Sequence, residues 1–302
     1  MYFKHLFFVV VFLISATVAH SAEYKSIVPY SAGSVSDIVA RTIENVFQRN
    51  TKNTIIIENV PGADTIVGTM NYKNNADKII MFTSSGQQIF NFALNEDPPY
   101  SKNDFNNIIY LGTTPGMWVV RADSNLHTPE DLVTKMPPFV GSYATSFGSN
   151  ITVMQKEKGV QTEVVPFKSS NDVMVAILSK TIDIGMTAAS PAIMENIKAG
   201  KLRVVGTSYK DDITIDGIQM LSVPKRLGVV QFHGILGIAL KPGLDAGTTT
   251  YLKRELWRAS TDPETVARLH SLFVIGAMNN NSKEIDKEYD RYRELAKKYL
   301  LK

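Results

Sequence analysis

Four short segments of the sequence are rich in serine, glycine and asparagine, which can bind anions through hydroxyl and backbone N–H groups. They cover residues 31–37, 84–86, 145–150 and 168–171. Each follows an apolar run typical of a strand and precedes a segment with helical character. The start of a helix carries free N–H groups and about half a positive charge, and together these favour a bound anion. The four segments therefore predict an anion site, although each one alone is equally typical of ordinary helix capping. Asp37 in particular is typical of an acid at a helix start.

The groups needed for most catalysis are absent from the sequence. It contains no cysteine, which excludes a disulfide, a thiolate metal site, a cysteine nucleophile and a lipid-modified N-terminal cysteine. Its five histidines are far apart and have no metal-binding spacing. There is no G-x-S-x-G elbow, dinucleotide fingerprint or phosphate-binding loop. We expect no catalytic residue, no metal ion and no cofactor, and hence a binding protein rather than an enzyme.

The elements that must position these segments alternate along the chain. Apolar runs predict strands at residues 26–30, 54–59, 79–83, 107–111, 117–121, 140–144, 163–167, 182–186, 202–206 and 234–240. Helical patterns lie between most of them, such as the stripe of Val39, Ile43, Val46 and Phe47. This alternation predicts an α/β fold with parallel sheets covered by helices. Ligands of such sheets bind beyond the carboxyl ends of the strands, where the four segments lie.

The N-terminus and the charge indicate where the protein works. One cation, Lys4, precedes an apolar run over residues 6–14 and then small residues up to Ala22, a pattern typical of a cleaved signal peptide over residues 1–22. The run is shorter than the roughly 20 residues of a membrane span, although an N-terminal anchor is the alternative. Cleavage after Ala19 or after Ala22 fits the pattern. A net charge of +3 without a basic cluster predicts no nucleic-acid partner.

Residues 27–41 read IVPYSAGSVSDIVAR and resemble the opening of the Bug receptors, the extracytoplasmic substrate-binding subunits of tripartite tricarboxylate transporters. Five further motifs follow in the family's order. They are ENVPGA at 58–63, TSSG at 83–86, PY at 99–100 with DF at 104–105, VPFK at 165–168 and IKAGKLR at 197–203. Each motif alone is weak, but their common order over nearly the whole mature chain is specific.

The resemblance implies a two-lobed type II periplasmic-binding-protein (Venus flytrap) fold with a mainly parallel sheet in each lobe. The first lobe would hold residues 23–121 and 235–302, the second would hold residues 122–234, and strands at 117–121 and 234–240 would cross between them. The implied function is capture of a small carboxylate in a Gram-negative periplasm by a monomer. The receptor would deliver it to the large and small membrane subunits of the transporter. A receptor that presents its ligand to a membrane sensor kinase is the alternative.

The resemblance also implies which residues bind the ligand. In this family a carboxylate is held by backbone amides and hydroxyls of the first loop and the serine-rich turn, without an arginine. Carried over by position, the first-lobe residues are Ala32, Gly33, Ser34, Ser36, Ser84, Ser85 and Gly86. The second-lobe residues are Ser146, Gly148, Ser149 and Asn150. We further expect the N–H groups from about Gly33 to Ser36 to be free for the anion.

The sequence departs from the family pattern at three places. Ser34 and Val35 replace a glycine and a small residue, and Ile151 stands where a histidine is usual. The third departure, TAA at residues 187–189, replaces a typical FDN. Loss of this acid argues against an amino group on the ligand and for a plain or more apolar carboxylate.

Overall fold

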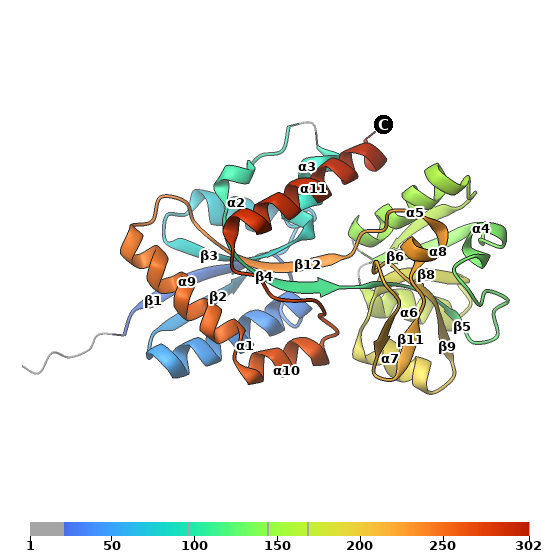
Figure 1. Ribbon diagram of the computed structural model, residues 1–302, viewed down its shortest axis with the longest axis horizontal. Coiled ribbons are helices and arrows are strands. Elements are labelled where there is room, and N and C mark those ends of the chain that lie inside the picture. The colour runs from blue at the N-terminus through green and yellow to red at the C-terminus, as the bar shows by residue number, and fades with distance from the viewer. Residues whose placement is uncertain (1–20, 96, 144, 168, 302) are drawn as a thin grey trace, which may run out of the picture.

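Two five-stranded sheets form the centres of two lobes, and the chain crosses between the lobes along β4 and β12 (Figure 1). This computed structural model describes residues 21–95, 97–143, 145–167 and 169–301. Residues 1–20 of the expected signal peptide therefore lie outside the described part. Within these ranges, no helix combines the length and apolar character needed to cross a membrane.

The first sheet has the strand order β2-β1-β3-β12-β4. Its strands are β1 (Glu23–Val28), β2 (Thr54–Asn59), β3 (Lys78–Ser84), β4 (Asn106–Thr114) and β12 (Gly234–Leu240). β1 pairs with β2 and β3 in parallel, whereas β12 is antiparallel to both β3 and β4. β12 therefore enters this sheet against the direction of its neighbours, after the chain has returned from the second lobe.

The second sheet repeats this plan in the order β7-β6-β8-β5-β9. Its strands are β5 (Gly116–Arg121), β6 (Phe139–Tyr143), β7 (Glu163–Phe167), β8 (Ile184–Ala188) and β9 (Leu202–Thr207). β5 has just arrived from the first lobe and is antiparallel to β8 and β9. The expected two-lobed α/β fold is confirmed. Half of the pairings in each sheet are antiparallel. In each sheet one strand, β12 or β5, follows directly after the chain has crossed from the other lobe, and it runs opposite to both of its neighbours.

The division of the chain into lobes stays a prediction, with one change. The sequence placed residues 117–121 in the first lobe, but every hydrogen-bonded neighbour of β5 belongs to the second sheet. This pairing favours a first boundary before Gly116 rather than after Arg121. The second expected boundary falls at the start of β12, which pairs in the first sheet.

Helices cover both sheets. Those of the first lobe are α1 (Val35–Thr51), α2 (Ile66–Asn74), α3 (Asn91–Leu94), α9 (Ala246–Ser260), α10 (Pro263–Ser271) and α11 (Ser282–Leu300), with the π-helix η1 (Gly86–Phe90) and the 3₁₀ turn η2 (Lys102–Asp104). Those of the second lobe are α4 (Asp131–Thr134), α5 (Thr145–Lys158), α6 (Ser170–Leu178), α7 (Pro191–Lys198) and α8 (Val223–Leu227). A hairpin, β10 (Ile213–Ile215) and β11 (Ile218–Met220), was not predicted, because three-residue strands are too short to show a periodic pattern.

Buried helix faces anchor these layers. The stripe predicted on α1 is confirmed, since Val39, Ile43, Val46 and Phe47 are all buried against the first sheet and its neighbouring helices. α11 exposes a charged face to solvent. Its other face packs on β4, η1 and α3, and the helix reaches α5 of the second lobe. α11 therefore joins the lobes in addition to the crossing strands.

Candidate functional site

The loop between β1 and α1 presents the start of a long helix. Ser34 is the N-cap of α1, and its hydroxyl accepts a hydrogen bond from the N–H of Asp37 at 3.2 Å. Gly33 has a φ of +80°, in the left-handed region that glycine adopts at little cost. The chain can therefore turn sharply out of β1 and begin α1 with its first amides exposed.

Asp37 stabilises this loop from within. Its carboxylate accepts hydrogen bonds from the Gly33 N–H at 2.8 Å, from Asn59 Nδ2 at 3.0 Å and from Arg41 Nε at 3.2 Å. The side chain is buried, which disfavours its charged form, but these hydrogen bonds and the charge of Arg41 outweigh the burial and lower its pKa. Asp37 is thus an internal anion with a full set of partners rather than a ligand contact.

The expectation that all N–H groups from Gly33 to Ser36 are free is therefore wrong. The Gly33 N–H donates to Asp37, and the Ser34 N–H donates to the Ser31 carbonyl at 3.1 Å. Among the described residues, the N–H groups of Val35 and Ser36 have no acceptor, as the first turn of a helix requires. These two amides remain available to an anion.

The two hydroxyls of the serine-rich turn at the end of β3 have different surroundings. The Ser84 hydroxyl contacts the Tyr30 hydroxyl at 2.6 Å, donates to Gln87 Oε1 at 2.7 Å and accepts from the Gly86 N–H at 3.2 Å. The Ser85 hydroxyl has no hydrogen-bond partner in the described part of the chain. Ser84 therefore shapes the turn, and Ser85 is the hydroxyl left for a ligand.

Three helices of the second lobe begin opposite these first-lobe loops. α5 begins at Thr145, α6 has Ser169 as its N-cap, and α7 has Ser190 as its N-cap. The Ser169 hydroxyl accepts from the Asp172 N–H at 3.1 Å, and the Ser190 hydroxyl accepts from the Ile193 N–H at 3.3 Å. Both caps satisfy one amide of their helix. The earlier amides of α6 remain for other acceptors, whereas α7 begins with Pro191 and has only the Ala192 N–H before the capped amide.

The helix starts meet in one cavity of about 230 Å³ between the lobes. Its lining is made of uncharged residues: Tyr30, Gly33, Ser34, Val35, Ser36, Ser84, Ser85, Thr114, Ser146, Phe147, Ser169, Ser170, Asn171, Ala188, Ala189, Ser190, Gly234, Ile235 and Leu236. A wider region of about 760 Å³ adjoins it and shares Tyr30, Gly33, Ser34 and Ser169. It is bounded further out by apolar residues such as Pro61, Val164 and Phe167 and by one acid, Asp64.

The cavity brings together most of the residues predicted to bind the ligand. Six of them line the 230 Å³ cavity, namely Gly33, Ser34, Ser36, Ser84, Ser85 and Ser146. Ala32 and Gly148 line the wider region. Gly86, Ser149 and Asn150 line neither. The placement of the first eight residues beside these two regions is observed. Contact of any of the predicted residues with a ligand stays a prediction.

Asn150 is bonded within the protein, and its predicted contact with a ligand stays untested. It is fully buried, and its side chain donates to the Phe232 carbonyl at 2.8 Å and accepts from the Phe232 N–H. These bonds tie α5 to the segment that leads into β12. Asn150 thus stabilises the chain just before the crossing strand β12. These bonds use one of the two N–H groups and one of the two oxygen lone pairs of the side-chain amide.

Gly86 is enclosed rather than exposed to the cavity. A methyl group added there would lie 3.3 Å from the Tyr30 hydroxyl and 3.3 Å from the Thr65 side chain. Its N–H is already bonded to Ser84. The residue therefore allows the turn to pack closely and does not itself provide a free donor.

Several cavity residues were not assigned from the sequence. Ser169, Ser170 and Asn171 belong to the fourth serine-rich segment, whose composition was noted although no contact was assigned to it. Ser190 follows the TAA departure at 187–189 and could have been found as a serine before a helix-starting proline. Thr114, Ile235 and Leu236 lie on the crossing strands, where the sequence shows no feature of a binding site.

The electrostatic character of the site comes from backbone dipoles. The N-termini of α1, α5, α6 and α7 line the cavity, and each carries partial positive charge. No lysine, arginine or histidine is among the lining residues. Such a site can hold a negatively charged group through amides and hydroxyls, with no opposite charge to satisfy when it is empty.

Comparison with known proteins finds a matching family. Residues 39–294 match the family described as tripartite tricarboxylate transporter family receptor. Protein BugT of Bordetella pertussis is 24% identical over 216 residues, which cover 67% of this chain and 65% of BugT, just under two thirds of its length.

Solved structures share the fold. A TctC solute-binding protein from Polaromonas superimposes with a TM-score of 0.74 at 19% identity, covering 93% of this chain and 98% of that one. MatC from Rhodopseudomonas palustris with bound malate has a TM-score of 0.75 at 15% identity, covering 92% and 98%.

Proposed function

The chain belongs to the tripartite tricarboxylate transporter receptor family, and on that premise we propose that it captures a small carboxylate in the periplasm. It then delivers this carboxylate to the large and small membrane subunits of such a transporter. Members of the family are solute-binding receptors that serve a transporter, not enzymes. The nature of the solute, the place of capture and the two partner subunits are the parts that we add.

One observation supports a carboxylate above all: four helix N-termini line an interlobe cavity that has no charged side chain. Each helix end stabilises a nearby anion by about 0.3–1 kcal/mol, and by up to about 2 kcal/mol when partly buried. Several such ends can offset the desolvation of a carboxylate group. The malate bound in MatC agrees with a carboxylate of this size.

The lining also indicates which carboxylates fit. Ala188 and Ala189 line the cavity at the place where an acid is typical of the family, and Thr187 beside them is buried. No aspartate or glutamate lines the 230 Å³ cavity. An ammonium group would therefore lose its hydration without gaining a counter-charge. We accordingly propose plain mono- or dicarboxylates, and not amino acids, as ligands.

A thermal-shift panel at pH 7.5 tests this selectivity. We expect at least one of succinate, malate, adipate and benzoate to raise the melting temperature. Glutamate, putrescine and maltose should leave it unchanged. A ligand at 100 times its Kd stabilises the folded state by about 2.7 kcal/mol, which corresponds to about 5 °C or more for a chain of this size. A shift with glutamate and with none of the plain acids would contradict the proposal.

Presentation of the ligand to a membrane sensor kinase is the second candidate, since it needs the same cavity and differs only in the partner. Capture by immobilised receptor of the large and small membrane subunits from solubilised membranes would support transport. A sensor kinase recovered in their place would support the alternative. The periplasmic location requires that the mature protein be released by osmotic shock with its leader removed.

A further inference from the structure

The π-helix η1 directly follows the Ser85 turn, and side chains from two other segments hold its carbonyls. The Tyr100 hydroxyl donates to the Gln87 carbonyl at 3.3 Å, and Arg293 Nε of α11 donates to the Gln88 carbonyl at 2.6 Å. π-Helices are rare and occur frequently at functional sites. The turn that presents a cavity residue is therefore built on an uncommon backbone conformation with external supports.

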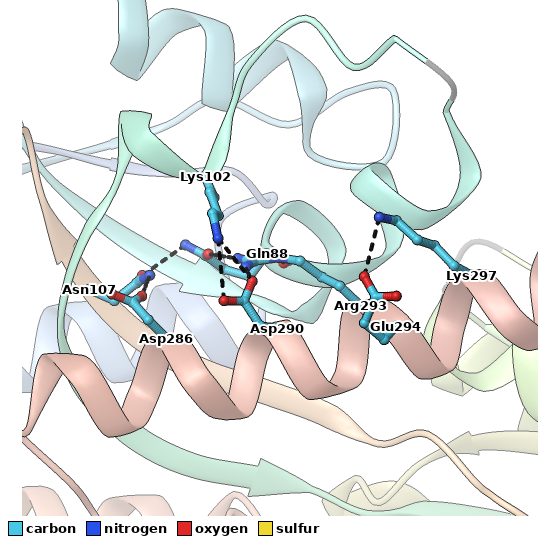
Figure 2. Close-up of polar contacts among 8 residues, drawn as sticks. All are labelled: Gln88, Lys102, Asn107, Asp286, Asp290, Arg293, Glu294 and Lys297. Atoms are coloured by element: carbon cyan, nitrogen blue, oxygen red, sulfur yellow. Dashed lines mark hydrogen bonds and ion pairs between the residues drawn. The ribbon is translucent and has the colours of Figure 1, made fainter.

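Arg293 is the strongest of these supports (Figure 2). Its side chain points from α11 to Gln88, where Nη2 also donates to the side-chain Oε1 at 3.2 Å, while Nη1 donates to Asp290 at 2.7 Å. Only 6% of the residue is exposed, and the guanidinium lies 5.1 Å from the centroid of the Phe92 ring. One arginine thus fixes both the backbone and the side chain of Gln88.

The network extends beyond Gln88 on both sides of η1. Gln88 Nε2 donates to Asn107 Oδ1 at 2.9 Å, and Asn107 Nδ2 donates to Asp286 of α11 at 2.7 Å (Figure 2). On the cavity side, the neighbouring Gln87 accepts from the Ser84 hydroxyl at 2.7 Å. Two consecutive fully buried glutamines therefore connect the binding turn with the C-terminal helix.

We propose that Arg293 is a positioning residue for ligand binding, which keeps η1 in its π form and so holds Ser85 toward the cavity. This role rests on the proposed function of the cavity. Without the arginine, the buried Gln88 carbonyl loses its charged donor, and the segment can relax to ordinary helical bonding. Conversion from π-helical to α-helical bonding removes one residue from the hydrogen-bonded turn. Because each helical residue accounts for about 100° of rotation, this conversion would turn the Ser85 hydroxyl away from the cavity.

The test compares two cations of α11. Arg293→Met removes the buried guanidinium. Lys297→Met makes the same kind of change one turn further along, where the ion pair with Glu294 is long, at 3.4 Å, and half-exposed (Figure 2). Arg293→Lys keeps the charge but cannot reach both oxygens of Gln88 and Asp290 together. Leu256→Ala in the buried core of the same lobe provides a destabilised variant with an unaltered turn.

Two readouts are measured on the full mature protein: Kd for malate and for adipate by calorimetry, and amide exchange of residues 84–90 without ligand. Arg293→Met should weaken binding by on the order of 10-fold, the loss expected for about one hydrogen bond, and accelerate exchange in that segment. Arg293→Lys should recover part of both. Lys297→Met and Leu256→Ala should keep the wild-type Kd.

Three results would overturn the positioning role. They are a wild-type Kd in Arg293→Met, unchanged exchange of residues 84–90, and a loss of affinity in Leu256→Ala as large as that in Arg293→Met. The last would mean that the affinity follows stability alone. If the wild type binds neither acid, Kd is measured with the acid that gives the largest shift in the thermal panel. A wild type that binds no acid of that panel would contradict the proposed function, and the exchange comparison would still show whether Arg293 holds the turn.

Discussion

Replacing Ser34 with aspartate should weaken carboxylate binding by more than about 100-fold while the protein stays folded. Aspartate is as good an N-cap as serine, so α1 should keep its start and gain a favourable charge at its positive end. The new carboxylate would compete with the ligand for the free amides of Val35 and Ser36. Two like charges about 4 Å apart repel by about 4 kcal/mol at an effective dielectric constant of 20.

Ser34→Asn is the matched control, since asparagine has the shape of aspartate and caps equally well without the charge. We expect its Kd to stay within several-fold of the wild-type value. Calorimetry on both variants, with circular dichroism to confirm folding, makes the comparison. Equal loss of affinity in the two variants would mean that size rather than charge matters at this position. Unaltered affinity in Ser34→Asp would place the anion elsewhere.

The second large effect is expected at Asp37, on stability. Asp37→Ala should lower the free energy of unfolding by about 1–3 kcal/mol, because the Gly33 N–H and the Asn59 amide lose their partly buried acceptor. Arg41 is half-exposed and can return to water, so its loss should add little. Asp37→Asn, which retains one acceptor oxygen, should fall between the alanine variant and the wild type.

The pH dependence of this effect has a defined sign. The hydrogen bonds and the Arg41 charge lower the pKa of Asp37 below its ordinary value of 3.8, against the opposing effect of burial. The contribution of its charge is therefore fully present above that value and is lost as pH falls through the lowered pKa. Urea unfolding of the wild type and Asp37→Asn should differ most near neutral pH, and the difference should shrink below pH 3.8. A difference that grows on acidification would contradict the role of the Asp37 charge.

The sequence carried enough information for the order of the elements but not for all of their pairings. The α1 stripe and strands such as β2, β7 and β12 were found at or near their observed bounds, because burial leaves a local periodic pattern. Which strands become neighbours is not a local property. Nothing in residues 116–121 or 234–240 shows that each run becomes the antiparallel strand of the sheet that the chain enters after it crosses between the lobes.

The residues that line the cavity were predicted best where helix-capping chemistry leaves a signal. Ser34 and Ser85 could be selected from composition and position. The hydrogen bond from the Gly33 N–H to Asp37 could not, because the placement of the Asp37 carboxylate depends on its contacts with Asn59 and Arg41. In the same way, the hydrogen bonds between Asn150 and Phe232 could not be predicted, because the two residues lie 82 positions apart in the sequence. Long-range partners of polar side chains decide such roles, and local sequence does not show them.

The central claim is that an uncharged cavity between the lobes holds a carboxylate by backbone amides and hydroxyls. The most direct test is a calorimetric titration at pH 7.5 of the wild-type receptor with adipate and with adipamide, which differ in charge but little in shape. The structure predicts a weakening of at least about 100-fold for the diamide, because helix N-termini stabilise the charged form. Equal affinity for the two, or tighter binding of adipamide, would contradict it.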